Sequence, residues 1–501
     1  MDTTEADSKP QSTDTPAIEE TSQYPHGVKL FLVTIGLLSA LFLVSLDGTV
    51  LATAIPAITN HFNSLNDVAW YGGSYLFAVS ALQLLYGKLY TMYRVKSVFL
   101  TAVALFELGS LVAGVAPTSD ALIVGRTISG TGAAGILAGI FTDDVTWRLC
   151  FLINLPFGVI TIVFLFFFLP PRLPTQPGLG WKEQIRQFDL PGTFILVPSI
   201  VSLLLALQWG GSIYPFNNGR IIALFLVAGV LAVAFVAVEI WQGDRATVPA
   251  RMIKNKNMLG GLWYGVFLGA SVVIFTYYLP IWFQAIEGVS ATQSGIRTLP
   301  GVLGIVLFAI IGGGVATALG QFVPLLIVSS VIATVGGGLL STLKVNSSIG
   351  YWFGFQILMA AGVGIGAQNV ILVGQVAVPS KDMAMATSVL SFSQTLSSSI
   401  FLAVGQTVFQ NRLQINLRSE APDVNPRNVI NGGVTAIRKI VSEEQLPPVL
   451  QAYNAAIMQT FYVAIAASGL SLAGPLLMDW LSLKTQAQAA TDEPVPNTTE
   501  K

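Results

Sequence analysis

Long apolar runs separated by short polar segments dominate the chain. A bilayer-spanning helix requires ~20 mostly apolar residues, and many runs reach that length. Thirteen such runs cover residues 30–57, 68–91, 97–116, 120–140, 150–170, 191–209, 220–241, 258–285, 298–319, 322–343, 351–377, 387–409 and 455–478. Most are too long and unbroken for the alternating strands of a membrane barrel. The pattern therefore predicts an all-α polytopic membrane protein.

Polar segments frame these runs. Residues 1–27 are acidic and rich in Pro and Thr, which is typical of a disordered tail, and residues from about 484 to 501 are similarly polar. No basic region precedes a short apolar core at the start, so we expect no cleaved signal peptide. The longest internal hydrophilic segment, 410–453, is predicted to be a partly ordered loop, and no soluble domain is left over.

Composition narrows the possible functions. The chain is 53% hydrophobic and 10% charged, whereas soluble proteins carry about 25% charged residues. Its net charge of −1 gives no reason to expect a nucleic-acid partner. One Cys and two His nearly exclude a Cys/His zinc site and a Cys–His nucleophile. We therefore expect that the protein is not an enzyme and binds no metal or cofactor. Its low charge also indicates that lipid surrounds most of its surface.

The positions of basic residues point to a gap in this layout. Short loops rich in Lys and Arg lie on the cytoplasmic side of a membrane. The basic loops contain Arg94 and Lys96; Arg172, Lys182 and Arg186; and Arg245, Arg251, Lys254 and Lys256. The second and third of these loops share a side, but the first falls on the opposite side. One additional crossing between residues 97 and 171 would place all three in the cytoplasm, and the segment 130–151 is the place we expect it.

Four stretches carry a family resemblance: LDGTVLATAIP (46–56), WYGGSYLFAVSALQLLYGKLYTMYRVKSVFL (70–100), GRTISGTGAAG (125–135) and FTDDVTWRLCFLINLPFG (141–158). They resemble motifs of the major facilitator superfamily, specifically of its fourteen-span drug:proton antiporters of fungal type. The resemblance covers about residues 28–480. It implies two six-helix halves with two extra central helices, near 191–209 and 220–241.

The chain departs from this family at one point. Members carry a fifth helix with a Gly/Pro-rich antiporter motif, but here the fourth-helix motif runs almost directly into FTDD (141–144). One helix plus a loop is therefore missing where the loop charges also indicate a gap. Three explanations stay open: an error in the gene model, a genuine deletion with lost activity, or a helix rearrangement. The loop after the second span also departs, because GKLYTMYRVK (87–96) has Lys88 and no Asp.

The resemblance gives a domain layout. We expect a cytoplasmic tail (1–27), an N-terminal transmembrane half (28–170), a linker with two extra transmembrane helices (171–257), a C-terminal transmembrane half with an extracytoplasmic loop at 410–453 (258–483) and a second cytoplasmic tail (484–501).

Three ionisable residues within the spans are candidates for proton coupling. A charge inside the hydrocarbon costs about 2.5–3.5 kcal/mol on insertion scales and usually faces a cavity or a partner. Asp47 interrupts FLVSLDGTVLATAIP and either faces such a cavity or ends its span at the interface. Arg126 matches the motif arginine, which exchanges acidic partners, or snorkels to the headgroups. Glu107, the most central acid, has either a proton or substrate role or a structural one.

Other polar positions have simpler interpretations. Glu239 is near a span end and is expected at the interface. GTGAAG (130–135) matches a dinucleotide fingerprint in form only, because no strand precedes it, so we interpret its glycines as helix-packing positions. Asn346 begins a glycosylation sequon that falls on the extracytoplasmic side of a fourteen-span layout. Neutral amides in the spans glue helices or line a substrate cavity, and the cavity candidates are Gln83, Gln284, Gln368 and Asn369.

These observations favour a proton-coupled efflux transporter, an antiporter that exports a toxin, drug or fungal secondary metabolite. Its partners would be protons and a small amphipathic organic substrate, and we expect a monomer in the cell membrane or, alternatively, the vacuolar membrane. The alternatives are a nutrient or siderophore transporter of the same fold and an inactive truncated product. The sequence does not specify the substrate or the proton stoichiometry.

Overall fold

The computed structural model describes residues 47, 51, 58, 61–62, 67–134, 189–210, 214–243, 246, 248–379, 382–426, 429–430 and 437–482. The apolar run 150–170 and the predicted gap near residue 140 lie outside these described residues, as do both tails. Three described positions of the first run's neighbourhood, Asp47, Leu51 and Ile58, are helical. Within the described part the regular structure is helical, and a single bridge joins Gly210 to Tyr214.

The described helices follow the apolar runs closely. They are α2 (Val68–Met92), α3 (Val95–Gly114), α4 (Ser119–Ala133), α8 (Leu190–Trp209), α9 (Gly219–Gln242), α10 (Ala250–Ile253), α11 (Lys256–Ala285), α12 (Ala291–Leu319), α13 (Val323–Leu340), α14 (Ile349–Val376), α15 (Met383–Glu420), α17 (Ile437–Ile440), α18 (Leu446–Ser471) and α19 (Ala473–Leu476). Within the described residues, eight helices are long and apolar enough to cross a membrane. The prediction of an all-α polytopic fold is confirmed.

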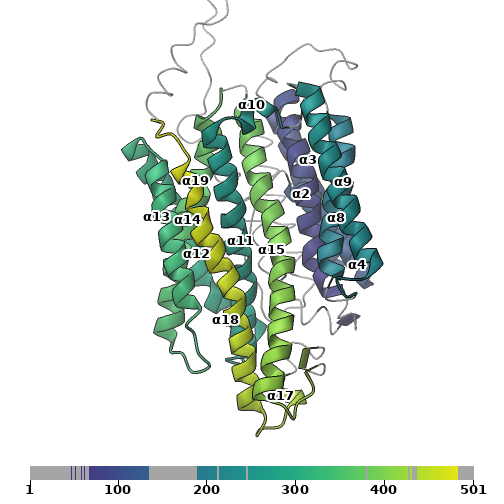
Figure 1. Ribbon diagram of the computed structural model, residues 1–501, viewed down its shortest axis with the longest axis vertical. Helices are drawn as coiled ribbons and strands as arrows, with labels where there is room; N and C mark the ends of the chain where they lie inside the picture. Colours follow the sequence, from purple (N-terminus) through teal and green to yellow (C-terminus); the bar gives the residue numbers. More distant parts are fainter. Residues whose placement is uncertain are drawn as a thin grey trace, which may run out of the picture.

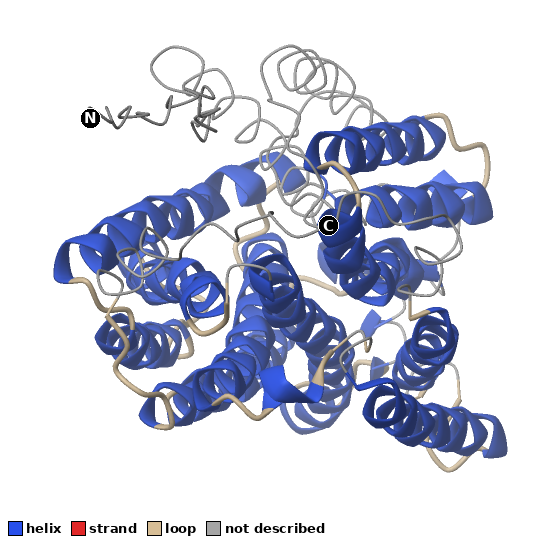
Figure 2. Cartoon of the chain, turned by 90° about the horizontal axis from the view of Figure 1, so that it is seen from above, coloured by secondary structure: helices blue, strands red, loops and turns tan. Residues whose placement is uncertain are grey.

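The long helices form two groups. Helices α2, α3, α4, α8 and α9 lie together on one side, and α11 to α14 with α18 and α19 lie on the other (Figure 1). Helix α15 runs between the groups, where it packs against α11 and α18 of one and α2 of the other. The view from above shows the same bundle end-on (Figure 2). A polar contact between α2 and α15 therefore depends on how closely the two groups are packed.

Small residues allow helices α3 and α4 to pack almost backbone to backbone. A Cβ atom added at Gly109 would collide with Ser129, and one added at Gly132 would collide with the backbone of Phe106. Gly130 likewise lies against the carbonyl of Tyr75 on α2. The interpretation of GTGAAG as a packing motif therefore holds for its described glycines, because close helix contact in lipid requires such residues.

This contact predicts a site-specific loss of stability. Gly132→Ala forces α3 and α4 apart, and overpacking of this kind costs about 1–3 kcal/mol. We expect the detergent-purified protein to melt several degrees lower, measured by the loss of monodisperse protein after heating. Gly338→Ala is the matched control, because a Cβ atom at this α13 glycine meets no atom within 4 Å. Equal melting temperatures for the two variants would contradict the packing argument.

The second group has a large aromatic and hydroxyl-rich core. Phe275 stacks on Phe461 with ring centroids 5.0 Å apart, which joins α11 to α18. Three buried hydroxyl pairs add polar links between helices: Tyr264 with Ser329 (2.5 Å), Ser271 with Ser468 (2.6 Å) and Ser330 with Ser471 (2.7 Å). Such hydrogen bonds stabilise contacts between helices, because lipid offers the hydroxyl groups no other partner.

The hydrophilic segment 410–453 is more helical than the sequence analysis expects. Helix α15 continues to Glu420, and α18 already begins at Leu446. Leu413 and Leu417 explain the extension, because these residues at helical spacing are 1% and 0% exposed. Helix α15 therefore contains 38 residues and is long for a single span.

The seam between the two groups has an apolar centre with one polar contact. Phe77 and Leu84 of α2 are buried in one cluster with Leu196, Ile200 and Leu204 of α8 and Val389 of α15. The hydroxyl groups of Ser80 and Ser399 lie 3.3 Å apart across the seam. Helix α8 thus contacts both α2 and α15.

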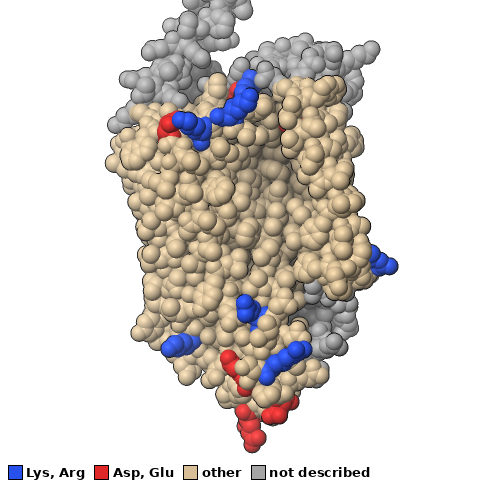
Figure 3. Space-filling view, in the orientation of Figure 1, with Lys and Arg blue, Asp and Glu red and all other residues tan. Residues whose placement is uncertain are grey.

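A broad band of the molecular surface carries no charged side chain on the face shown in Figure 3. The Lys, Arg, Asp and Glu side chains on this face lie above the band, at the upper end, and below it, in the lower half of the molecule and at its right edge about midway along its length. On the outside of helices α9 and α12, apolar side chains such as Val233, Ile310 and Leu226 are more than two-thirds exposed. An uncharged belt with exposed apolar residues is what a bilayer requires.

Candidate functional site

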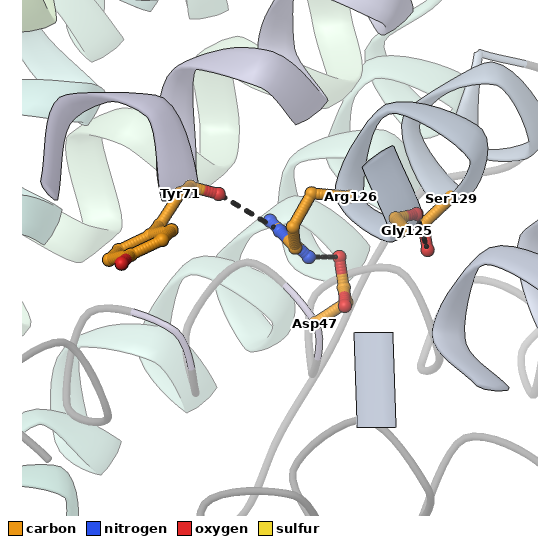
Figure 4. A network of polar contacts seen from close by, with 5 residues as sticks. All are labelled: Asp47, Tyr71, Gly125, Arg126 and Ser129. Atoms are coloured by element: carbon orange, nitrogen blue, oxygen red, sulfur yellow. Dashed lines mark hydrogen bonds and ion pairs between the residues drawn. The ribbon is translucent and has the colours of Figure 1, made fainter. Parts of the chain in front are cut away.

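The centre of the candidate site is a buried ion pair between Asp47 and Arg126. One Nη atom of Arg126 donates to Asp47 Oδ2, and the two side chains are 1% and 0% exposed. Arg126 Nε also donates to the carbonyl of Tyr71 at 3.0 Å, and its guanidinium carbon lies 4.4 Å from the centre of the Tyr75 ring. Figure 4 shows Arg126 between the Tyr71 carbonyl and Asp47. The structure therefore brings together two of the three residues predicted for proton coupling.

Helix α4 positions this arginine. Thr118 caps the start of the helix by accepting from Ala121 N at 3.2 Å, and Arg126 follows about two turns later. Gly125, the preceding residue, lets the helix approach Ala113 of α3. Ser129 donates back to the Gly125 carbonyl at 3.1 Å, as Figure 4 also shows. These contacts direct Arg126 away from α3 and into the interior, so the snorkelling alternative does not describe this side chain.

The surroundings of the pair contain further unsatisfied polar atoms. Within the described residues, Asp47 Oδ1 and the hydroxyl groups of Ser74 and Tyr75 have no hydrogen-bond partner, although each is buried. A buried polar atom without a partner costs about 1–3 kcal/mol, so such groups call for an explanation. A water molecule or another polar group bound beside the pair would supply the missing partners.

Glu107 is the third predicted residue and lies on α3. Its side chain is 8% exposed, whereas its neighbour Leu108 is 50% exposed, so α3 turns the acid inward. Neither carboxyl oxygen has a hydrogen-bond partner in the part of the chain that the structure describes. It is not joined to the ion pair by a bond, but the charge of Asp47 acts on it. The alternative role, that of a structural acid held by hydrogen bonds, is therefore not supported by any hydrogen bond within the described residues.

The four amides predicted for a substrate cavity do not lie in one place. Gln83 on α2 and Gln284 near the end of α11 are each 5% exposed, with side-chain oxygens that lack partners within the described residues. Asn369 donates to the Ile365 carbonyl of its own helix at 2.7 Å. Gln368 lies against Gly313 of α12. The two α14 residues thus belong to the α12–α14 contact, whereas Gln83 is near the seam.

Residues that the sequence analysis did not single out also build the site. Tyr71 and Tyr75 contact Arg126 through a carbonyl and a ring, and their spacing of four on α2 is the signal that could have found them. Glu239, expected at the interface, is 7% exposed, and its Oε2 accepts from Val248 N at 2.6 Å. Glu239 thus lies near a span end, as expected, but protein covers it there.

An open cavity of about 790 Å³ lies at the end of the second group where α11 and α13 end and α18 begins. Arg297 forms an ion pair with Glu287 there, and its guanidinium lies 5.8 Å from the Trp352 ring centre. Asn346 lines this cavity and is exposed in a turn. Within the described residues, no group of three His, Cys, Asp or Glu side chains could hold a metal ion.

The exposure of Asn346 allows a direct test of its predicted glycosylation. We expect the full-length protein from a eukaryotic host to shift in mobility on treatment with an N-glycosidase, and Asn346→Gln to lose that shift completely. Asn497 begins a second sequon, NTT, in the predicted cytoplasmic tail, so Asn497→Gln is the matched control and should keep the shift. A shift that survives Asn346→Gln would place this turn on the cytoplasmic side.

Together, the uncharged belt, the two helix groups and the charge pair buried against α2 define a multi-pass membrane protein. The family model described as the Major Facilitator Superfamily matches residues 37–138 and 130–402. The chain belongs to the major facilitator superfamily.

Proteins from filamentous fungi are similar over nearly the whole chain. The "MFS-type transporter astH" of Aspergillus oryzae is 45% identical, over 93% of this chain and 89% of its own length. The "Efflux pump roqT" of Penicillium rubens is 44% identical, over 90% of this chain and 91% of its own length. Among solved structures, an auto-inhibited peptide transporter of the POT family has a TM-score of 0.54 at 13% identity, covering 95% of this chain and 99% of that chain, so it supports the fold alone.

Proposed function

We propose that this protein exports small amphipathic organic molecules in exchange for protons. The observation that carries the proposal is the ion pair of Asp47 and Arg126, which is fully buried and joins two long apolar runs of the chain, 30–57 and 120–140. Ionisable residues at this depth mark ion and substrate pathways in membrane transporters. The relatives in filamentous fungi that are named efflux pumps support the direction of transport.

A proton and Arg126 would compete for Asp47. Protonation of the carboxylate removes the charge that holds one Nη atom, whereas the bond from Nε to the Tyr71 carbonyl and the Tyr75 ring contact remain available. Glu107 would supply a second protonation site beside this pair. Proton binding can shift the balance between two states only if its affinity differs between them, and breaking a buried ion pair provides such a difference.

The seam between the helix groups is the proposed substrate path. It combines apolar side chains with a few uncharged polar groups, among them Gln83 and the hydroxyl pair of Ser80 and Ser399. Sites of this composition bind amphipathic molecules through apolar area and orient them by a few hydrogen bonds. In the proposed cycle, the two groups rock about this seam and open it to alternate sides.

We also propose that one helix of the family fold is absent near residue 140. The two matches to the family model share residues 130–138, next to the junction where the sequence analysis expects the gap. The alignment to the A. oryzae relative spans 503 positions but takes in only 93% of this chain, so that relative has a few tens of positions without a counterpart here. This is enough for a span of ~20 residues and a loop.

Transport by purified protein tests the proposal. The full-length chain is placed in liposomes whose interior is one pH unit more acidic than the bath, and uptake of the fluorescent probes ethidium and rhodamine 6G is followed. We expect uptake that needs the gradient, accompanied by proton release reported by a trapped pH dye. Protein-free liposomes control for passive leakage.

A second protein separates a wrong assignment from an inactive product. It carries the corresponding segment of the A. oryzae relative inserted at Gly139–Thr142. Gradient-driven uptake by this version alone would assign the missing helix as the cause of inactivity. Uptake by neither version, for any amphipathic probe, would contradict the proposed function.

A further inference from the structure

The two extra helices are in contact with both helix groups. Helices α8 and α9 pack together as a hairpin, and α8 lies against α2 on one side and α15 on the other. Leu196, Ile200 and Leu204 share one apolar cluster with residues of both partners. The hairpin is therefore not a passive spacer, because any separation of α2 from α15 must also disturb its packing.

A buried charged cluster lies where this hairpin meets the end of α2. Lys88 of α2, Asp189 before α8 and Glu239 of α9 are 4%, 2% and 7% exposed. The charges of both acids act on the Lys88 ammonium group. This is the end of the bundle that carries Arg251, whose side, by the distribution of basic residues, is cytoplasmic.

Both acids are fixed by hydrogen bonds, one within the hairpin and one from the segment that follows α9. Asp189 Oδ1 accepts from Gly192 N at 2.7 Å and from the side chain of Gln242 on α9. Glu239 Oε2 accepts from Val248 N at 2.6 Å. The hairpin thus holds two buried, oriented carboxylates, one of them at the start of α8, the helix that packs against α2.

The same hairpin is tied to the second helix group. In the segment after α9, Arg251 donates to Asp382 at 3.1 Å, just before α15, and Asn255 donates to the Ala377 carbonyl at 2.8 Å, just after α14. One short stretch of chain therefore connects α2, through the hairpin, to the start of α15.

We propose that Lys88, Asp189 and Glu239 are positioning residues of the transport cycle: they form a cytoplasmic strap by which the two extra helices hold α2 against α15. The inference rests on the proposed alternating-access function and assigns the extra helices a part in it. The loop motif that follows Lys88 contains no acid of its own, and the carboxylates come instead from the hairpin. Removing one member of a buried ionic cluster leaves the others uncompensated, so the loss of a single charge should weaken the contact strongly.

A disulfide across the seam measures the strap without any substrate or proton gradient. Ser80 and Ser399 are changed to Cys in a full-length chain whose single native cysteine is replaced by Cys150→Ser. Their hydroxyl oxygens lie 3.3 Å apart, so thiol groups introduced at the two positions are direct neighbours across the seam. In membranes treated with a mild oxidant, the rate of disulfide formation then reports how often α2 and α15 are packed together.

We expect Lys88→Gln and Asp189→Asn each to slow disulfide formation at least about fivefold, the lower end of typical couplings between sites. Asn at position 189 can still cap α8, so this variant removes charge while keeping the helix start. Lys88→Arg should restore the parent rate. Asp120→Asn, which neutralises an exposed acid at the start of α4, should leave it unchanged.

Monodisperse protein in detergent verifies that each variant is folded. Parent rates in both folded Lys88→Gln and folded Asp189→Asn protein would overturn the strap. An equal slowing by Lys88→Arg would also overturn it, because that variant keeps the charge. Since the measurement needs no transport, failure of the strap and failure of the proposed export are distinguishable.

Discussion

Asp47→Asn is expected to abolish uphill export. The substitution keeps the size of the side chain but removes the charge that compensates Arg126, which is 1% exposed. A pH difference of one unit is worth about 1.4 kcal/mol per proton, or a tenfold concentration ratio, and a protein that cannot couple to it reaches a ratio of one. We therefore expect probe accumulation in acidic liposomes to fall from about tenfold to none. Gradient-driven uptake, followed by fluorescence, measures this directly.

The same variant should also be less stable, since breaking a buried pair by removing one partner costs about 3–5 kcal/mol. The double variant Asp47→Asn with Arg126→Gln tests the origin of both effects. It removes both charges, so it should regain thermal stability but not uphill transport. Asp120→Asn controls for the loss of an acid elsewhere. Full accumulation by folded Asp47→Asn protein would remove this residue from the coupling mechanism.

Glu107→Gln is expected to separate transport from coupling. No hydrogen bond to this carboxyl group is lost within the described residues, and the side chain stays buried at the same size, so we expect normal folding. Without a protonatable group at this position, the protein should still exchange labelled for unlabelled ethidium across the membrane at the parent rate. Accumulation against a gradient should fall about tenfold, to a ratio near one, for a one-unit pH difference.

The readouts for Glu107 distinguish coupling from structure. Glu107→Asp should retain accumulation in part, because the acid is kept. Glu420→Gln, at an exposed position at the end of α15, should retain it in full. If Glu107→Gln lost exchange and accumulation together while remaining folded, the residue would act in substrate passage and not in proton coupling.

The helices could be predicted from the sequence because a chain that crosses lipid must satisfy its backbone hydrogen bonds internally. A stretch of ~20 apolar residues has few alternatives to a spanning helix, so α9, α11 and α14 appear close to their predicted bounds. The ends were less accessible. Leu413 and Leu417 sit among polar residues, and their burial at helical spacing, which extends α15, depends on tertiary packing.

The candidate site was predictable where a charge stood out against apolar neighbours. Asp47 and Arg126 lie 79 residues apart, and the sequence names each as a candidate without predicting that the two side chains pair. For the amides of α14, the sequence predicts an inward direction but not which helix each one faces. Lys88 and Glu239 stand near span ends, where sequence alone does not separate a residue in the headgroups from one covered by protein.

The length of α15 has a practical consequence. Its 38 residues correspond to about 57 Å of helix, whereas the hydrocarbon core of a bilayer is about 30 Å thick. The part of α15 that extends beyond the detergent micelle is an asymmetric feature on a particle whose other helices the micelle covers. An antibody fragment raised against the stem at residues 411–420 would give electron cryomicroscopy the feature it needs to align images of so small a transporter.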